Sequence, residues 1–96
     1  MLIIIMAKIY VVHMWEDNQK EAVMQFAEQI KTMAQQKKLP AGLKLLSIDL
    51  AENKNMAICQ WEAPSVNDLM NAASQLKPTW KIEAFTYKNV YKKGFL

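Results

Sequence analysis

Two side chains of this sequence carry the functional groups from which transition-metal sites are built. His13 is the only histidine of the chain, and Cys59 is its only cysteine. Imidazole and thiolate bind nickel, copper and zinc, so His13 and Cys59 are the candidate ligands for nickel or another transition metal. No C-x-x-C or H-x-x-x-H spacing supplies further ligands. The alternative is that His13 is structural and that Cys59 is a small buried hydrophobe with a protonated thiol.

One carboxylate, Glu62, is a candidate general base, because it ends a predicted strand just before a turn and a cavity there would desolvate it. The alternative is an ordinary exposed carboxylate at a strand end. The sequence contains neither a glycine-rich phosphate loop nor a serine nucleophile elbow. It therefore does not establish whether the protein is an enzyme.

The length and the composition, with 52% hydrophobic and 22% charged residues, are typical of one folded domain, and we expect it to span residues 1–96. The net charge is +3, but the chain has no arginine, the residue best suited to phosphate and base contacts, so nucleic acid is not an expected partner. The apolar run Met1–Val12 is interrupted by Lys8 and falls short of the roughly 20 residues that span a membrane. A single cysteine and the lack of a secretory signal indicate a cytoplasmic protein.

The elements that must position these side chains follow from hydrophobic periodicity. The pattern predicts strands over 3–14, 43–50, 56–62 and 80–91, and helices from 16–18 to 37–38 and from 65 to 77. Asp17 or Asn18 is the expected cap of the first helix, and Ser65 with Asp68 that of the second. The order βαββαβ predicts an α+β, ferredoxin-like fold, with a four-stranded antiparallel sheet and two helices on one face.

Strand alternation predicts which side chains face the helices. His13 has helix-facing parity, as do six hairpin residues: Leu46, Ile48, Leu50, Ala57, Cys59 and Trp61. The opposite face, here called the open face, is too apolar to be simply solvated, so a second copy of the chain is expected to cover it. Two such faces would close a barrel and place a candidate ligand site among Tyr10, Asp49, Gln60, Glu62, Phe85 and Tyr87. The alternative is that these groups only satisfy one another at a dimer interface.

The chain resembles the dimeric α/β-barrel superfamily, and within it two small families. The segments Gly42–Leu46 and Trp80–Phe85 are similar to the second and fourth strands of a group of uncharacterised single-domain proteins. Val12-His13 and Cys59–Ser65 are similar to the pattern of a nickel-binding-protein-like family. The resemblance covers nearly the whole chain. It implies the ferredoxin-like fold and a homodimer. The additional histidines that monooxygenases and cyclases of the superfamily often use are not found here.

Three functions follow as hypotheses. The first is a homodimer that binds a small molecule or a transition metal without chemistry. The second is a cofactor-independent monooxygenase or isomerase acting on an aromatic or quinone-like substrate. The third is a structural interaction module, which predicts a barrel interior filled by side chains.

Overall fold

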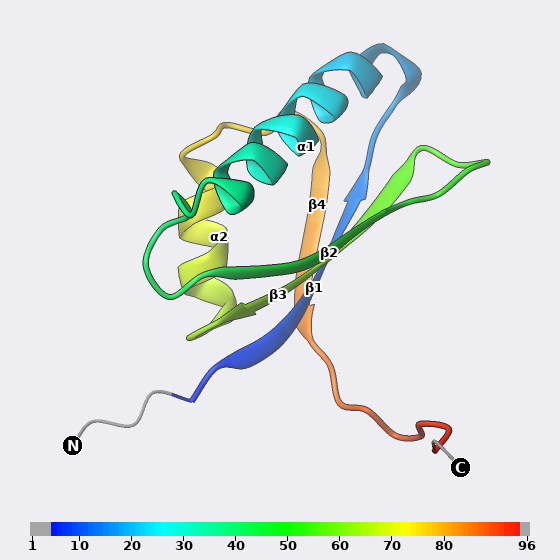
Figure 1. The fold of residues 1–96 in the computed structure, drawn as a ribbon. Helices are drawn as coiled ribbons and strands as arrows, with labels where there is room; N and C mark the ends of the chain where they lie inside the picture. The colour runs from blue at the N-terminus through cyan, green and yellow to red at the C-terminus, as the bar shows by residue number, and fades with distance from the viewer. Residues whose placement is uncertain (1–4, 95–96) are drawn as a thin grey trace.

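The computed structural model describes residues 5–94 and contains four strands and two α-helices (Figure 1). In chain order the elements are β1 (Ala7–Met14), the 3₁₀ turn η1 (Asp17–Gln19), α1 (Lys20–Gln35), β2 (Lys44–Leu50), β3 (Met56–Ala63), α2 (Val66–Ser74) and β4 (Lys81–Thr86). No helix among the described residues is long and apolar enough to cross a membrane.

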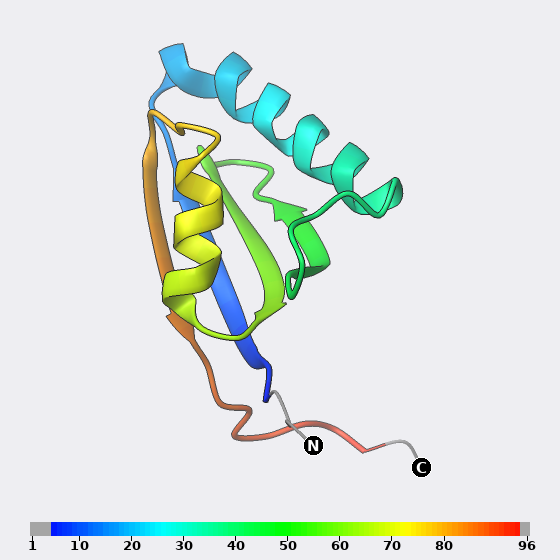
Figure 2. The same ribbon diagram turned by 90° about the vertical axis from the view of Figure 1, so that its left-hand side faces the viewer.

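The four strands form one antiparallel sheet in the order β2-β3-β1-β4, and both helices lie on one side of it (Figures 1 and 2). The predicted ferredoxin-like βαββαβ fold is thereby confirmed, with the first and third strands in the centre. The helices make only marginal contact with each other, and Figure 2 shows β3 between them. Both helices pack on the sheet, α1 against β2 and α2 against β3 and β4.

The two helix starts differ in how they are capped. Ser65 accepts a hydrogen bond from the Asp68 backbone N–H over 3.1 Å, which confirms the predicted cap of α2. The expected caps Asp17 and Asn18 are wrong, because both lie within η1, where Glu16 holds the cap position of η1 and Gln19 that of α1. There the Gln19 side chain accepts from the Glu16 backbone N–H over 2.9 Å, and the Asp17 carboxylate accepts from Asn55 over 2.7 Å instead.

Strand β2 contains a register shift that changes which of its residues face the helices. Leu45 pairs with Trp61, but the next pair along the ladder is Ser47 with Gln60. The extra residue, Leu46, is 39% exposed, whereas Leu45 packs against the core. The predicted inward position of Leu46 is therefore wrong, because a β-bulge reverses the alternation at that point.

The predicted inward residues Ile48, Ala57, Cys59 and Trp61 do belong to the core. Leu50 pairs with Ala57 on the helix side of the sheet but remains 55% exposed. It lies at the end of an edge strand, where neither helix covers it.

The first and the last strand of the chain, β1 and β4, are shorter than the sequence pattern predicts. Strand β1 begins at Ala7, with Ile5 83% exposed before it, and residues 3 and 4 of the predicted strand lie outside the described residues. Strand β4 ends at Thr86 rather than at Tyr91, which is 81% exposed. A strand needs a neighbour for its backbone groups, and in the register of β1 with β4 only Lys8 and Ala7 lie beyond the pair of Ile9 with Thr86. Residues from Asn89 onward therefore have no partner in β1.

Candidate functional site

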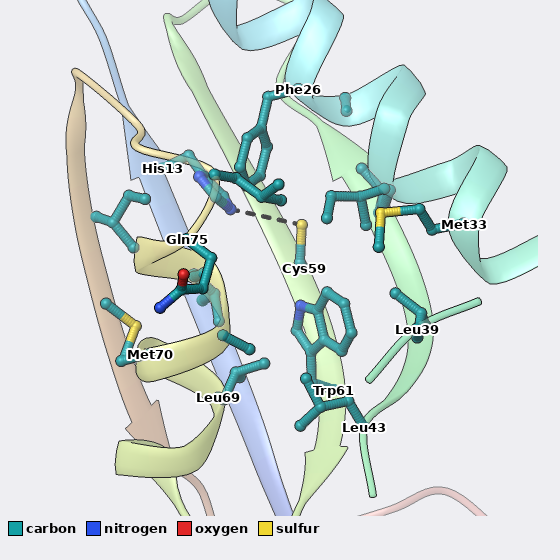
Figure 3. Close-up of a pocket in the computed structure, with 18 of the residues that line it drawn as sticks. His13, Phe26, Met33, Leu39, Leu43, Cys59, Trp61, Leu69, Met70 and Gln75 are labelled. Atoms are coloured by element: carbon teal, nitrogen blue, oxygen red, sulfur yellow. Dashed lines mark hydrogen bonds between the residues drawn. The ribbon is translucent and has the colours of Figure 1, made fainter. Parts of the chain in front are cut away.

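His13 and Cys59 lie on the two central strands and face the helices. His13 is opposite Ala57 in the register of β1 with β3, and Cys59 is two residues further along β3 on the same face. Side chains in this diagonal relation are within reach of each other in an antiparallel sheet. The His13 Nε2 and the Cys59 Sγ are 3.6 Å apart, and both residues are buried (Figure 3). The structure thus brings the two candidate metal ligands together.

Trp80 determines which nitrogen of His13 carries the proton. Its indole Nε1–H donates a hydrogen bond of 3.0 Å to the His13 Nδ1. An indole N–H can only donate, so Nδ1 must be the unprotonated nitrogen, and the neutral imidazole carries its proton on Nε2. The Nε2–H then points toward the sulfur of Cys59, which is a weak acceptor. The hydrogen bonds therefore run in one direction, from Trp80 through His13 to Cys59.

Burial keeps His13 and Cys59 uncharged at neutral pH. Desolvation lowers the pKa of His13 from 6.5 to about 4, because the imidazolium would lose its hydration. Burial first, and the charge of Asp49 second, raise the pKa of Cys59 from 9.0 to about 11. The thiolate is the nucleophilic form of cysteine, so this pair lacks the activated thiol that covalent catalysis requires.

The hydrogen bonds around His13 do not fit a metal ion on its Nε2. A histidine that binds a metal through one ring nitrogen donates the N–H of the other nitrogen to an acceptor. A metal on Nε2 would place a proton on Nδ1, where the indole N–H of Trp80 already points. Within the described chain, no group of three His, Cys, Asp or Glu residues is placed to hold a metal. The metal role of His13 and Cys59 stays a prediction, and it requires Trp80 to move.

An apolar cavity of about 190 Å³ adjoins the His13–Cys59 pair, between the sheet and the two helices (Figure 3). Its polar lining consists of His13, Cys59, Gln75 and the indole of Trp61, and no charged residue of the described chain lines it. Aliphatic, aromatic and methionine side chains make up the rest, including Phe26, Ile30, Met33, Leu69, Met70 and Ile82. Such a surface can surround an apolar molecule but offers no countercharge to an ion.

The residues predicted to bind a ligand lie on the other side of the sheet, on the open face. Tyr10 stacks on Tyr87 with ring centroids 3.8 Å apart, and its ring is tilted against Phe85 with centroids 6.1 Å apart. Gln60 is opposite Tyr10 in the register. Three of the six predicted residues therefore lie around a fourth, Tyr10.

The two carboxylates of the predicted ligand site lie further out on the same face. Glu62 is opposite Lys8 on β1 and Lys44 on β2, and Asp49 is exposed opposite Ile58. The sheet separates Glu62 from the cavity. The predicted general-base role of Glu62 refers to a barrel closed by a second copy on the open face, and it stays a prediction.

Two features of the site are absent from the sequence-based interpretation, namely the hydrogen bond from Trp80 to His13 and the cavity itself. A signal for the first exists in the register. Ile82 is opposite His13, and Trp80 is two residues before Ile82 on the same face, so Trp80 is diagonal to His13 on the β4 side. The cavity has no comparable signal, because it depends on the angle between two helices.

Comparison of the chain with models of known protein families, with curated proteins and with solved structures finds no match. The geometry of the site is therefore the basis on which a function can be inferred.

Proposed function

We propose that this protein binds a small, uncharged, apolar molecule in the cavity between the sheet and the helices, and that it does so as a homodimer joined through the open face. The observation that carries the proposal is the cavity of about 190 Å³ beside the buried His13–Cys59 pair. A well-packed core has few voids larger than a water molecule. An apolar hollow of this size, partly open to solvent, is therefore a feature to be explained in so small a domain.

The size of the cavity suits a compound with a single ring. An apolar protein cavity of roughly 150 Å³ is known to stay dry and to bind benzene. The present cavity is somewhat larger, at about 190 Å³. Two methionines in its wall, Met33 and Met70, have flexible side chains that can adapt to the shape of a ligand.

Binding without chemistry is the function that the side chains support best. The Cys59 thiol is protonated at neutral pH, since its pKa is about 11, and the imidazole of His13 is neutral, since its pKa is about 4. A general base works best with a pKa near the operating pH, and a nucleophilic thiol needs a lowered pKa. His13 and Cys59 do not meet these conditions. Their pKa values therefore do not support the alternative of a cofactor-independent monooxygenase or isomerase.

The homodimer is supported by the composition of the open face. Phe85 is 45% exposed there, beside the stacked rings of Tyr10 and Tyr87. The strands place three lysines and three carboxylates on this face, namely Lys8, Lys44, Lys81, Asp49, Glu62 and Glu83. A surface that is apolar and balanced in charge suits contact with its own copy, as in a two-fold dimer. Such a dimer would be an α/β barrel of the superfamily that the chain resembles.

The binding of toluene, followed by NMR, tests the proposed site. Toluene is neutral and has one ring, so it should shift the indole resonance of Trp61 and the methyl resonances of Ile30 and Leu69, all of which line the cavity. The methyl resonances of Ile58, on the open face, should stay in place. Shifts confined to the open face, or no shift up to the solubility limit of toluene, would contradict the proposal.

A matched pair of substitutions gives the control for this experiment. Ala73→Phe on α2 places a ring in the cavity and should abolish the shifts, whereas Ala22→Phe at an exposed position of α1 should not. If Ala73→Phe does not fold, the mapping on the wild-type protein still decides between the two faces.

A further inference from the structure

At the His13–Cys59 end of the cavity the polar groups are hydrogen-bond donors and the sulfur is only a weak acceptor. The strong acceptor among the described lining residues is the side-chain amide of Gln75, at the C-terminal end of α2. The Nδ1 of His13 is occupied by the Trp80 N–H, so the Nε2–H is the group that points toward Cys59. The Cys59 thiol is itself a donor, and its sulfur accepts only weakly. A ligand oxygen is a better acceptor for the Nε2–H than this sulfur is.

We infer that the cavity selects small neutral carbonyl compounds, such as one-ring aldehydes, ketones or quinones, whose oxygen accepts the Nε2–H of His13. This inference rests on the proposed function and names the ligand class for the same cavity. The apolar lining would enclose the ring, and the carbonyl oxygen would replace the Cys59 sulfur as the acceptor.

Other oxygen compounds fit this end of the cavity less well. A carboxylate would be buried without a cation, because no charged residue of the described chain lines the cavity. An alcohol would satisfy the Nε2–H with its oxygen but would bring an O–H that needs an acceptor, and beside His13 that acceptor is the weak sulfur of Cys59. Among the side chains that the described residues bring to the cavity, only the amide of Gln75, an exposed residue at the end of α2, could offer a stronger one. A carbonyl oxygen accepts and has nothing to donate, so it leaves no polar group unpaired.

Acetophenone and α-methylstyrene test the inference, because they have the same shape and differ in a C=O against a C=CH₂ group. The measured quantity is the ratio of their dissociation constants, obtained by NMR or calorimetric titration of the intact protein. His13→Phe should reduce the preference for acetophenone about tenfold, the loss of one good hydrogen bond. Comparing ratios between variants cancels the different cost of removing the two compounds from water.

Two control variants identify the donor. Gln75→Leu removes the one side-chain amide that residues 5–94 contribute to the cavity wall and should leave the ratio unchanged. Cys59→Ala removes the competing sulfur and should leave the ratio unchanged or raise it. A ratio that falls in Cys59→Ala or in Gln75→Leu, but not in His13→Phe, would assign the donor elsewhere and overturn the inference.

A second measurement does not depend on any variant folding. The side-chain ¹⁵N resonances of His13 should show a bare Nδ1 and a protonated Nε2 between pH 6 and pH 8, and ¹³C-labelled acetophenone should show a downfield shift of its carbonyl when bound. A proton on Nδ1 would overturn the inference. If both compounds bind and the ratio of their dissociation constants is the same in the wild-type protein and in His13→Phe, the ligand class alone is refuted. If neither compound binds, the proposed function is refuted.

Discussion

His13 is buried against aromatic and sulfur side chains, and its protonation is therefore coupled to folding. Its ring lies 6.0 Å from that of Phe26 and 6.3 Å from that of Trp80, measured between centroids. The pKa of His13 is about 4 in the folded protein against 6.5 for an unperturbed histidine. The unfolded chain thus binds a proton more readily between these two values, and acid in that range favours unfolding.

The stability of the protein should therefore fall between pH 7.5 and pH 5. The contribution of His13 is complete above pH 6.5, decreases through the window down to about pH 4, and is lost below it. Between pH 7.5 and pH 5 the loss should be about 2 kcal/mol, measured by urea unfolding at the two values.

The variant His13→Gln provides the control for this pH dependence. It does not titrate and keeps an oxygen that can accept the hydrogen bond from Trp80, so its stability should change much less over the same range. An equal pH dependence in both proteins would show that His13 is not the group responsible.

At the scale of residues, the proximity of His13 and Cys59 could be predicted, since strand parity and adjacent central strands are both readable from the sequence. The tautomer of His13 could not be predicted, because it depends on the direction in which the Trp80 ring points. Periodicity assigns a residue to a face of a strand but does not orient its side chain.

At the scale of elements, the two helices differ in how much they depend on local signals. Helix α2 has nine residues, whereas α1 has 16. Short helices are marginal in isolation, so the start of α2 needs support from its cap and from Leu69, its buried residue. The Ser65 side chain supplies that support through the Asp68 backbone N–H.

Replacement of this cap should have a measurable cost. Ser65→Ala should lower the free energy of unfolding by about 1 kcal/mol, because the Asp68 N–H loses its acceptor. Ser74→Ala is the matched control on the same helix. The Ser74 hydroxyl donates to the Asn71 carbonyl at the exposed C-terminal end, so its removal should cost much less. Equal losses in chemical denaturation would contradict the role given to the cap.

The order and type of all six regular elements could be predicted from the sequence, but the bulge in β2 was not. The adjacent apolar residues Leu45 and Leu46 break the alternation of that strand. Ile48 faces the helices, and in a regular strand the residue two positions before it, Leu46, would face the same side. The structure instead buries Leu45 opposite Trp61, because the extra residue Leu46 shifts the register of β2 at this point. Consecutive apolar residues in a strand are the available signal for such a bulge.

At the scale of the whole molecule, the two faces of the sheet have different tasks in the proposed function. The helix side contains the cavity, and the open face would meet a second copy. The fold class could be predicted because it depends on element order. The angle between the helices, and with it the cavity, could not be predicted, because side-chain packing over long sequence distances decides it.

The dimer predicted for the open face should respond to a charge at Phe85. Wild-type protein is expected to sediment as a dimer at micromolar concentration. Phe85→Lys removes apolar burial worth about 2 kcal/mol per copy and should weaken dimerisation at least tenfold. Gln29→Lys, at an exposed position of α1, adds the same charge and should have no effect. A wild-type monomer at these concentrations, with the open face exposed to water, would contradict the dimer.

The cavity between the sheet and the two helices also has a mechanical consequence. The apolar hollow of about 190 Å³ adds to the volume of the folded chain wherever water does not fill it, and unfolding removes that void. Hydrostatic pressure favours the state of smaller volume, so compression should weaken this fold more than it would weaken a domain of equal size with a filled centre. A molecule seated between the helices would remove that weakness, and the protein would then resist compression as a solid core does.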